Sequence, residues 1–292
     1  MGAMADRNEL GTFLRSRRER VTPAAVGLPT GHRRRTPGLR REELAMLAGI
    51  SVDYLVRLEQ GRETNPSTEV LASLATALRL EEAERLHLSH LATLNDRHPG
   101  LCPTLTEGVS NTTITVLDRL DGTPAFVMDA LTNVLAWNDS YERVFGATGM
   151  LDGDPPNIVR YTFLDPRARE TYGDWDRGAR EQVASLRYYA SWHHEKPAFQ
   201  ELVGELSVKS NEFAKLWSRH DVGEKMRGEK LLHHPTAGAI NLNFEVFFLP
   251  DHPQRRMVVQ VPADAASSEV VDRLLQVEPP AEPAPLRLVT GA

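Results

Sequence analysis

The first 41 residues carry ten arginines and no lysine, a concentration of one side-chain chemistry that the rest of the chain lacks. The arginine guanidinium is a planar fork of donors that matches phosphate oxygens and guanine edges better than the compact lysine ammonium. The whole chain has a net charge of −6, but residues 1–41 sum to +7, residues 42–100 to −5 and residues 101–292 to −8. This asymmetry predicts an anionic partner for the first part of the chain only.

Adjacent histidines offer a second kind of chemistry, metal binding, at His193-His194-Glu195 and at His233-His234. Neighbouring residues on a helix point about 100° apart, so such pairs do not share a face. The sequence has no Walker, dinucleotide or Gly-x-Ser-x-Gly motif, and no His-x3-His pair with a carboxylate on one expected helix. We therefore expect no metal site and no enzyme, and we expect the histidines to be solvated.

The length of 292 residues suits roughly two domains of about 150 residues each. The composition, 41% hydrophobic and 25% charged, is typical of a folded globular chain. The single cysteine, Cys102, excludes an intrachain disulfide and a multi-cysteine zinc site. No apolar run approaches the ~20 residues of a membrane span, and no signal-peptide order is present. We expect a cytoplasmic protein that does not use a membrane.

Apolar residues recur at helical spacing through residues 8–94, most clearly in residues 71–78. Within this region, residues 39–62 predict two short amphipathic helices around Gly49, which can adopt a left-handed turn without a Cβ penalty. Ser51 is a good N-cap for the second helix. Two short helices joined by a tight turn of this kind are the geometric requirement of a helix-turn-helix.

The segment 39–62 closely resembles the helix-turn-helix domains of phage repressors and of the xenobiotic-response-element family of bacterial regulators. The Leu-Glu-Gln-Gly-Arg end of the segment and the Asn-Pro-Ser that follows are part of this likeness, which extends over residues 8–94. The resemblance implies an all-α, lambda-repressor-like domain that binds a double-stranded DNA operator, with residues 51–60 in the major groove. A helical bundle that binds no DNA is the alternative.

By this resemblance, Val52, Asp53 and Arg57 point toward base edges, and Arg57 is the candidate for a bidentate contact to guanine. Compensation of the helix N-terminal dipole explains Asp53 equally well. Arg40 stands where an N-cap Ser, Thr, Asp or Asn is usual, and a phosphate contact explains this exception. The remaining candidates for contacts to the DNA are Arg33, Arg34, Arg35, Arg41, Ser51, Tyr54, Arg62 and Thr64.

Residues 95–108 combine turn-forming residues with no hydrophobic period, and we place the domain linker there. Beyond it, two short apolar runs between residues 124 and 137 predict a hairpin, residues 166–192 and 197–218 predict one helix each, and residues 229–261 predict three strands. Strands that are separated from helices in this way indicate an α+β domain with an antiparallel sheet. The tail at 279–292 is proline-rich and expected to be disordered.

Three segments of the second part are distinctive: Pro124-Ala-Phe-Val-Met, Asn133-Val-Leu-Ala-Trp-Asn and Asn157-Ile-Val-Arg-Tyr-Thr-Phe. With His234-Pro235 they resemble the ligand-binding domain of MmyB-like regulators, transcription factors with a PAS-like sensor behind the DNA-binding domain. The resemblance covers about residues 105–262. It implies a fatty acid or similar apolar small molecule as effector, with no cofactor.

A pocket of this kind is mostly apolar with a few polar anchors, for which Asn157, Arg160 and His234 are candidates. Arg160 suits a carboxylate head, although a surface salt bridge is the commoner role of such an arginine. We expect a homodimer, because one recognition helix reads few base pairs. The alternative is a second domain that serves only dimerisation or protein interaction. The apolar candidates for the pocket are Phe126, Trp137, Phe163, Leu186, Tyr189, Trp217 and Phe244.

Overall fold

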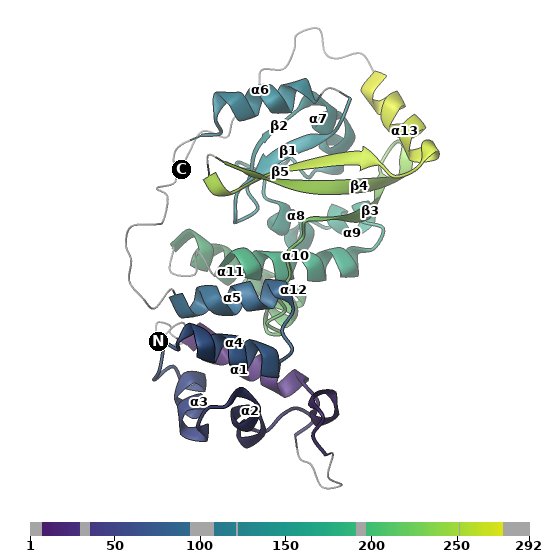
Figure 1. Cartoon of the computed structure of the whole chain (residues 1–292). Coiled ribbons are helices and arrows are strands. Elements are labelled where there is room, and N and C mark those ends of the chain that lie inside the picture. The colour runs from purple at the N-terminus through teal and green to yellow at the C-terminus, as the bar shows by residue number, and fades with distance from the viewer. Residues whose placement is uncertain are drawn as a thin grey trace. The chain divides into compact units, whose positions relative to one another are not determined.

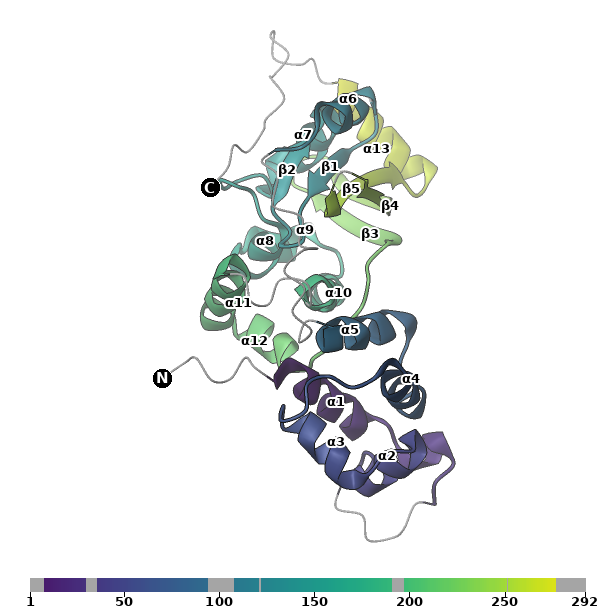
Figure 2. The ribbon, with the colours of Figure 1, turned by 60° about the vertical axis from the view of Figure 1, so that its left-hand side comes forward.

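The computed structural model divides the chain into two compact units, seen from two directions in Figures 1 and 2. The first unit comprises Met1–Leu101 together with the short segment Arg219–Gly223, and the second comprises Cys102–Ser218 and Glu224–Ala292. The expected tail at 279–292 lies outside the described residues, as do residues 94 and 105 at the expected domain limits. The structure describes residues 8–29, 36–93, 108–120, 122–190, 197–250 and 252–276.

The described part of the first unit is all-α, as the sequence predicts. Gly49, at the end of α2, has φ 66° and ψ 28°, the left-handed conformation expected of the turn. The Ser51 hydroxyl accepts a hydrogen bond from the Tyr54 N–H at 3.1 Å and so caps α3. The helices are α1 (Glu9–Arg20), η2 (Pro23–Val26), α2 (Arg41–Ala48), α3 (Val52–Glu59), α4 (Thr68–Ala77) and α5 (Glu82–Thr93).

Leucine and alanine side chains form the core of the first unit. Gly11 on α1 shows how closely the helices approach, because a Cβ there would overlap the carbonyl oxygens of Leu58 and Glu59. Asn8 caps α1 by accepting from the Gly11 N–H, and its amide donates to the Glu59 carbonyl at 2.8 Å. The start of α1 is therefore fastened to the end of α3. The completely buried leucines are Leu14, Leu39, Leu44, Leu55, Leu58 and Leu74.

The second unit is an α+β domain built on one antiparallel five-stranded sheet, which confirms the predicted fold class. The strand order is β2-β1-β5-β4-β3, so the last strand lies between the first and the fourth. The strands are β1 (Ala125–Met128), β2 (Val134–Trp137), β3 (Arg227–His234), β4 (Gly238–Leu249) and β5 (His252–Pro262). The helices are α6 (Asn111–Arg119), α7 (Asp139–Phe145), η3 (Gly146–Thr148), α8 (Ile158–Leu164), α9 (Arg167–Thr171), α10 (Trp175–Ala190), α11 (Pro197–Lys209), α12 (Asn211–Trp217) and α13 (Ala265–Gln276).

Alternating strand residues serve the two faces of this sheet. On β1, Ala125 and Val127 belong to a core shared with Leu117 of α6, whereas Phe126 belongs to the larger core on the other face. That larger core also takes in side chains of α7, α10 and α13. The alternation is the period of two that a strand with both faces covered requires.

The expected helix at 166–192 is broken, and this is a correction to the sequence prediction. Tyr172 forms an antiparallel bridge with Leu232, and the Gly173 N–H donates to the Leu231 carbonyl at 3.0 Å. A Cβ at Gly173 would overlap the Leu231 side chain, so a glycine is needed at this close approach to β3. The expected helix at 197–218 is likewise divided at Ser210, whose hydroxyl caps α12.

Asn138 connects three elements of the second unit from a buried position. Its backbone precedes α7, and its amide oxygen caps that helix. All its hydrogen-bonding capacity is used inside the protein, which fixes the end of α6 and the start of β1 against α7. The amide nitrogen donates to the carbonyls of Leu117, Leu120 and Thr123 at 3.3, 3.0 and 2.9 Å, and the amide oxygen accepts from the N–H groups of Ala125 and Tyr141 at 3.0 and 2.9 Å.

Candidate nucleic-acid interface and ligand cavity

Helix α3 presents one polar side to solvent and buries the other. Val52, Asp53 and Arg57 are exposed, while Leu55 and Leu58 are completely buried. The Arg57 guanidinium lies over the Tyr54 ring, 5.6 Å from its centroid. Within the part of the chain that the structure describes, that guanidinium forms no hydrogen bond or ion pair. Its donors therefore stay available for an external acceptor.

Arg40 and Arg62 flank the two helices of the helix-turn-helix motif and are both exposed. The backbone N–H of Arg40, the N-cap residue of α2, donates to the Glu43 carboxylate at 2.7 Å. This N–H is therefore satisfied without the arginine side chain, which makes no capping hydrogen bond. Among the described residues, neither guanidinium has an ion-pair partner. Cations placed in this way are suited to phosphate oxygens of a DNA backbone.

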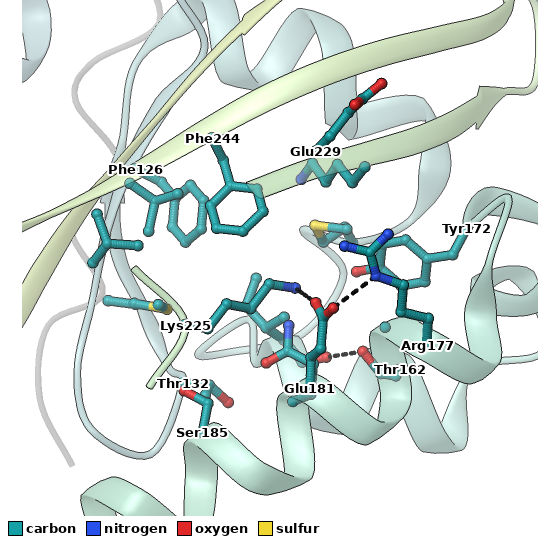
Figure 3. Close-up of a pocket in the computed structure, with 18 of the residues that line it drawn as sticks. Phe126, Thr132, Thr162, Tyr172, Arg177, Glu181, Ser185, Lys225, Glu229 and Phe244 are labelled. Carbon is teal, nitrogen blue, oxygen red and sulfur yellow. Dashed lines mark hydrogen bonds and ion pairs between the residues drawn. The ribbon is translucent and has the colours of Figure 1, made fainter. Parts of the chain in front are cut away.

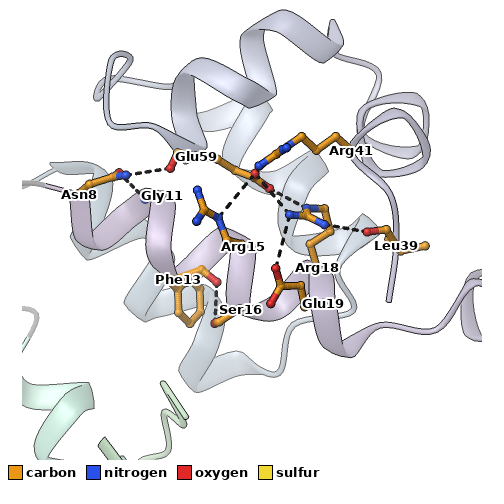
Figure 4. Close-up of polar contacts among 10 residues, drawn as sticks. All are labelled: Asn8, Gly11, Phe13, Arg15, Ser16, Arg18, Glu19, Leu39, Arg41 and Glu59. Atoms are coloured by element: carbon orange, nitrogen blue, oxygen red, sulfur yellow. Dashed lines mark hydrogen bonds and ion pairs between the residues drawn. The ribbon is translucent and has the colours of Figure 1, made fainter. Parts of the chain in front are cut away.

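Three arginines surround the carboxylate of Glu59, the last residue of α3 (Figure 4). Its buried carboxylate accepts from Arg18 Nε at 2.6 Å and from Arg41 Nε at 2.7 Å, and Arg15 Nε lies 4.0 Å away. Arg18 also donates to the Leu39 carbonyl at 2.9 Å. Arg41, predicted from sequence to contact phosphate, is thus engaged by an internal acid, and part of the arginine concentration is structural.

Two further arginines of α1 are also paired within the first unit. Arg17 forms an ion pair with Glu84 of α5 at 3.2 Å and is buried. Arg20 donates to the Asp221 carboxylate at 2.7 Å, in the segment Arg219–Gly223 that belongs to this unit. Of the described arginines in the arginine-rich segment, Arg17, Arg18, Arg20 and Arg41 are thus engaged by acids of the first unit, whereas Arg40 is not. The predicted contacts at Arg33, Arg34 and Arg35 lie outside the described residues, and Thr64 follows α3 as a half-buried residue.

The second unit contains a cavity of about 340 Å³ (Figure 3). Strands of the sheet line one side of it, and helix α10 lines the opposite side with residues spaced three or four apart, such as Arg177, Glu181 and Ser185. Its volume lies within the range typical of small-molecule sites, about 300–1,000 Å³. The apolar side chains that line it are Phe126, Met128, Met150, Ile158, Leu231, Phe244, Val246 and Val258.

Of the apolar residues predicted to line a pocket, the structure brings two together, Phe126 and Phe244. The others pack among themselves or against different partners. Phe163 contacts Trp175 and Phe213 edge-on, and Trp217 is stacked on Phe213 with ring centroids 5.6 Å apart. Large aromatic surfaces are satisfied by such packing in a core. The remaining three, Trp137, Leu186 and Tyr189, are buried outside the cavity wall.

The three predicted polar anchors also lie outside the wall of this cavity. Asn157 caps α8, Arg160 Nε pairs with Glu205 at 2.8 Å, and His234 Nδ1 accepts from the Ala237 N–H at 3.0 Å in the turn after β3. Each has a local structural role in the protein itself. In the described chain no group of three or more His, Cys, Asp or Glu could hold a metal ion.

The charged residues of the cavity wall were missed from sequence. Glu181 pairs with Arg177 Nε at 2.8 Å and with Lys225 Nζ at 2.9 Å (Figure 3). Arg256 is almost completely buried, donates to the Asp129 carbonyl at 2.9 Å and lies 3.8 Å from the centroid of the Tyr189 ring. Desolvation lowers the pKa of the Arg256 guanidinium below its usual value.

Lys230, on β3, also lines the cavity. Its ammonium lies over the face of Phe145, 4.6 Å from the ring centroid. Desolvation, with a smaller contribution from the charge of Lys225, lowers the pKa of Lys230 to about 7. No sequence signal marks this residue, because a lysine on a strand of mixed polarity is usually solvated.

A helical unit with an exposed reading helix, followed by an α+β unit with an internal cavity, defines the class of ligand-responsive DNA-binding regulators. The comparisons with known families agree. A helix-turn-helix domain model matches residues 9–88, and the model of the MmyB-like transcription regulator ligand binding domain matches residues 109–274. Because the second match spans more than half of the chain, the protein belongs to the family of MmyB-like transcription regulators. No curated protein matches the sequence.

Proposed function

We propose that this transcription regulator binds a double-stranded DNA operator through its first unit and an apolar, fatty-acid-like effector through the cavity of its second unit. The cavity carries this proposal, because it is about 340 Å³ in volume and aromatic and aliphatic side chains form much of its wall. An effector changes DNA affinity only by its difference in affinity for two conformations of the protein. The regulator is proposed to act in the cytoplasm and to have no enzymatic role.

On the DNA side, the exposed face of α3 supports base reading by Arg57, with Val52 and Asp53 beside it. Arg40 and Arg62 are proposed to contact phosphates, because each is exposed and has no internal acid among the described residues. One recognition helix reads few base pairs. We therefore propose a homodimer, assembled with help from the second unit, on two half-sites about one helical turn apart.

Filling the cavity tests the proposal. Gly178 lies on α10 in the cavity wall, and a Cβ built there meets no atom within 4 Å. Gly178→Phe places a ring in that space, and Gly178→Ala adds only a methyl group. Gly204→Phe is the matched control, because Gly204 is also helical with open space around its Cβ but lies outside the cavity wall.

Binding of dodecanoic acid to the full chain is measured by calorimetry, and operator affinity is measured with and without it on DNA selected from a random pool. We expect binding and a change in operator affinity for the native chain and for Gly204→Phe, and loss of both for Gly178→Phe. Unchanged binding by Gly178→Phe would place the effector elsewhere. Absence of any bound ligand in the native chain would favour a second unit used only for dimerisation or protein interaction.

A further inference from the structure

The charges that line the cavity are mostly matched within the protein. The Glu181 carboxylate lies between Arg177 and Lys225, and the Asp174 carboxylate accepts from the backbone N–H of Arg177 at 3.0 Å. Lys230 differs from these residues. Within the described residues its ammonium has no hydrogen-bond or ion-pair partner, and it lies over the electron-rich face of Phe145.

Lys230 lies on the same face of the sheet as the apolar wall of the cavity. It is paired in register with Leu242 on β4, which is completely buried. Two residues away on β3, Gly228 is paired in register with Phe244, whose ring lines the cavity and would lie 3.0 Å from a Cβ at position 228. The lysine stem is half-buried among these groups, so the ammonium is partly removed from water. A cation in such a place is stabilised strongly by an anion that enters with a ligand.

We propose that Lys230 is the head-group receptor of the cavity, and that the effector is an amphipathic carboxylate whose tail lies along Phe126 and Phe244. This inference rests on the proposed function, because it assumes that the cavity takes a ligand. A single carboxylate suits the site better than a phosphate, because lysine offers one compact charge. Arg177 and Lys225 are less suited to the head group, since both are already paired with Glu181.

Binding of the carboxylate is coupled to a proton. In the empty cavity Lys230 titrates near pH 7, so above that pH a growing fraction of molecules holds it neutral. An adjacent carboxylate favours the charged ammonium and raises its pKa, so binding takes up a proton. The affinity for the carboxylate therefore falls as the pH rises above 7. The other ionisable groups that line the cavity are Tyr141, Tyr172, Asp174, Arg177, Glu181, Lys225, Glu229 and Arg256.

The experiment compares dodecanoate with dodecan-1-ol, which has the same tail and no charge, on the full chain. Binding is measured by calorimetry from pH 6 to pH 9 for the native protein, Lys230→Met and Lys209→Met. Lys209 is the matched control, because it is an exposed lysine on α11 that pairs with Glu205 at 2.8 Å outside the cavity. Calorimetry in buffers of different ionisation enthalpy reports the proton uptake.

We expect the native protein and Lys209→Met to prefer dodecanoate over the alcohol by about tenfold at pH 6, the scale of one charge-assisted hydrogen bond. Lys230→Met is expected to bind both probes with similar affinity and without proton uptake. Its retained binding of the alcohol shows that the variant is folded.

The outcomes separate this inference from the proposed function. If Lys230→Met keeps the preference for dodecanoate, or if the native chain binds acid and alcohol equally, Lys230 is not the receptor while the cavity remains a ligand site. If the native chain binds neither probe, the proposed fatty-acid-like effector fails and this inference with it.

Discussion

Arg41 Nε donates to Glu59 Oε2 at 2.7 Å, and this contact joins the first residue of α2 to the last residue of α3. The same carboxylate holds Arg18 of α1 at 2.6 Å. The Glu59 carboxylate thus holds α1, α2 and α3 together on the buried side of α3. Its partners come from the arginine-rich segment that, from sequence alone, indicated only an external anion.

Glu59→Gln should destabilise the first unit by about 3 kcal/mol, because it leaves the buried Arg18 guanidinium with only the distant, exposed carboxylate of Glu19 at 3.9 Å. Chemical denaturation of the full chain, followed by a probe in the first unit, measures the change. Arg15→Ala is the control: this arginine lies 4.0 Å from Glu59 with 47% of its side chain exposed, so a loss of less than about 1 kcal/mol is expected. Equal losses in the two variants would contradict the assigned role of Glu59.

Arg57→Ala should weaken operator binding by about 1–3 kcal/mol and relax the base preference at one position. The reason is its place on the exposed face of α3, with no competing acid among the residues described. Binding to a library of operators randomised one position at a time measures the effect. A uniform loss over all sequences would show that Arg57 contacts the backbone instead.

Arg40→Ala should weaken binding to all sequences about equally and reduce the salt slope, d log K/d log[salt], by about one unit. Arg62→Ala should behave in the same way. Titrations between low and moderate salt on specific and unrelated DNA distinguish this effect from that of Arg57. A sequence-dependent loss for Arg40→Ala would reverse the proposed division of roles.

Asn138→Ala should destabilise the second unit by about 2–4 kcal/mol, since it removes the cap of α7 and the side-chain donor shared by the carbonyls of Leu117, Leu120 and Thr123. Asn138→Asp keeps the shape but turns a carboxylate toward those carbonyls, so it should not restore stability. Thermal and denaturant unfolding of both variants measure this. An Asp variant as stable as the native chain would contradict the hydrogen-bond assignment.

Lys230→Met should stabilise the ligand-free protein near pH 6 by about 1–3 kcal/mol, because a partly desolvated charge is replaced by an apolar chain of similar size. The native pKa of about 7 is below the unfolded value of 10.5, so between these values the unfolded chain binds more protons. The stability of the native chain therefore rises with pH in this window. The advantage of the variant should shrink by at most about 1.4 kcal/mol per pH unit above 7, and a constant advantage from pH 6 to 9 would exclude this titration.

Local signals were sufficient for the helix-turn-helix and insufficient for the cavity. Gly49 and Ser51 act through their own backbone and side chain, so their roles are readable from residue type and are confirmed. The break between α9 and α10 depends instead on β3, which comes much later in the chain and forms a bridge with Tyr172. A periodic pattern in residues 166–192 cannot report a contact of that kind.

The residues that line the cavity could not be predicted from the sequence either, because they too are brought together by contacts between distant segments. Lys230 and Arg177 belong to elements whose polar residues usually face solvent, and only the packing of α10 over the sheet turns them toward a shared space. Asn157 and Arg160 drew attention as polar residues in an apolar segment, but a helix cap and an ion pair account for them. The proposed contacts of Arg40, Arg57 and Arg62 with DNA stay predictions.

The position of β5 at the centre of the sheet determines the order in which the two units can fold during synthesis on the ribosome. Ala125 is paired in register with Val259, so the centre of the sheet stays incomplete until nearly all of the second unit has been synthesised. The core of helices α1 to α5, by contrast, comes almost entirely from the first part of the chain, and the later segment Arg219–Gly223 adds Val222 and the Asp221 contact to Arg20. Most of the first unit can therefore fold while the second unit is still incomplete. A nascent chain stalled before residue 252 would present the helix-turn-helix beside a sheet that lacks its central strand.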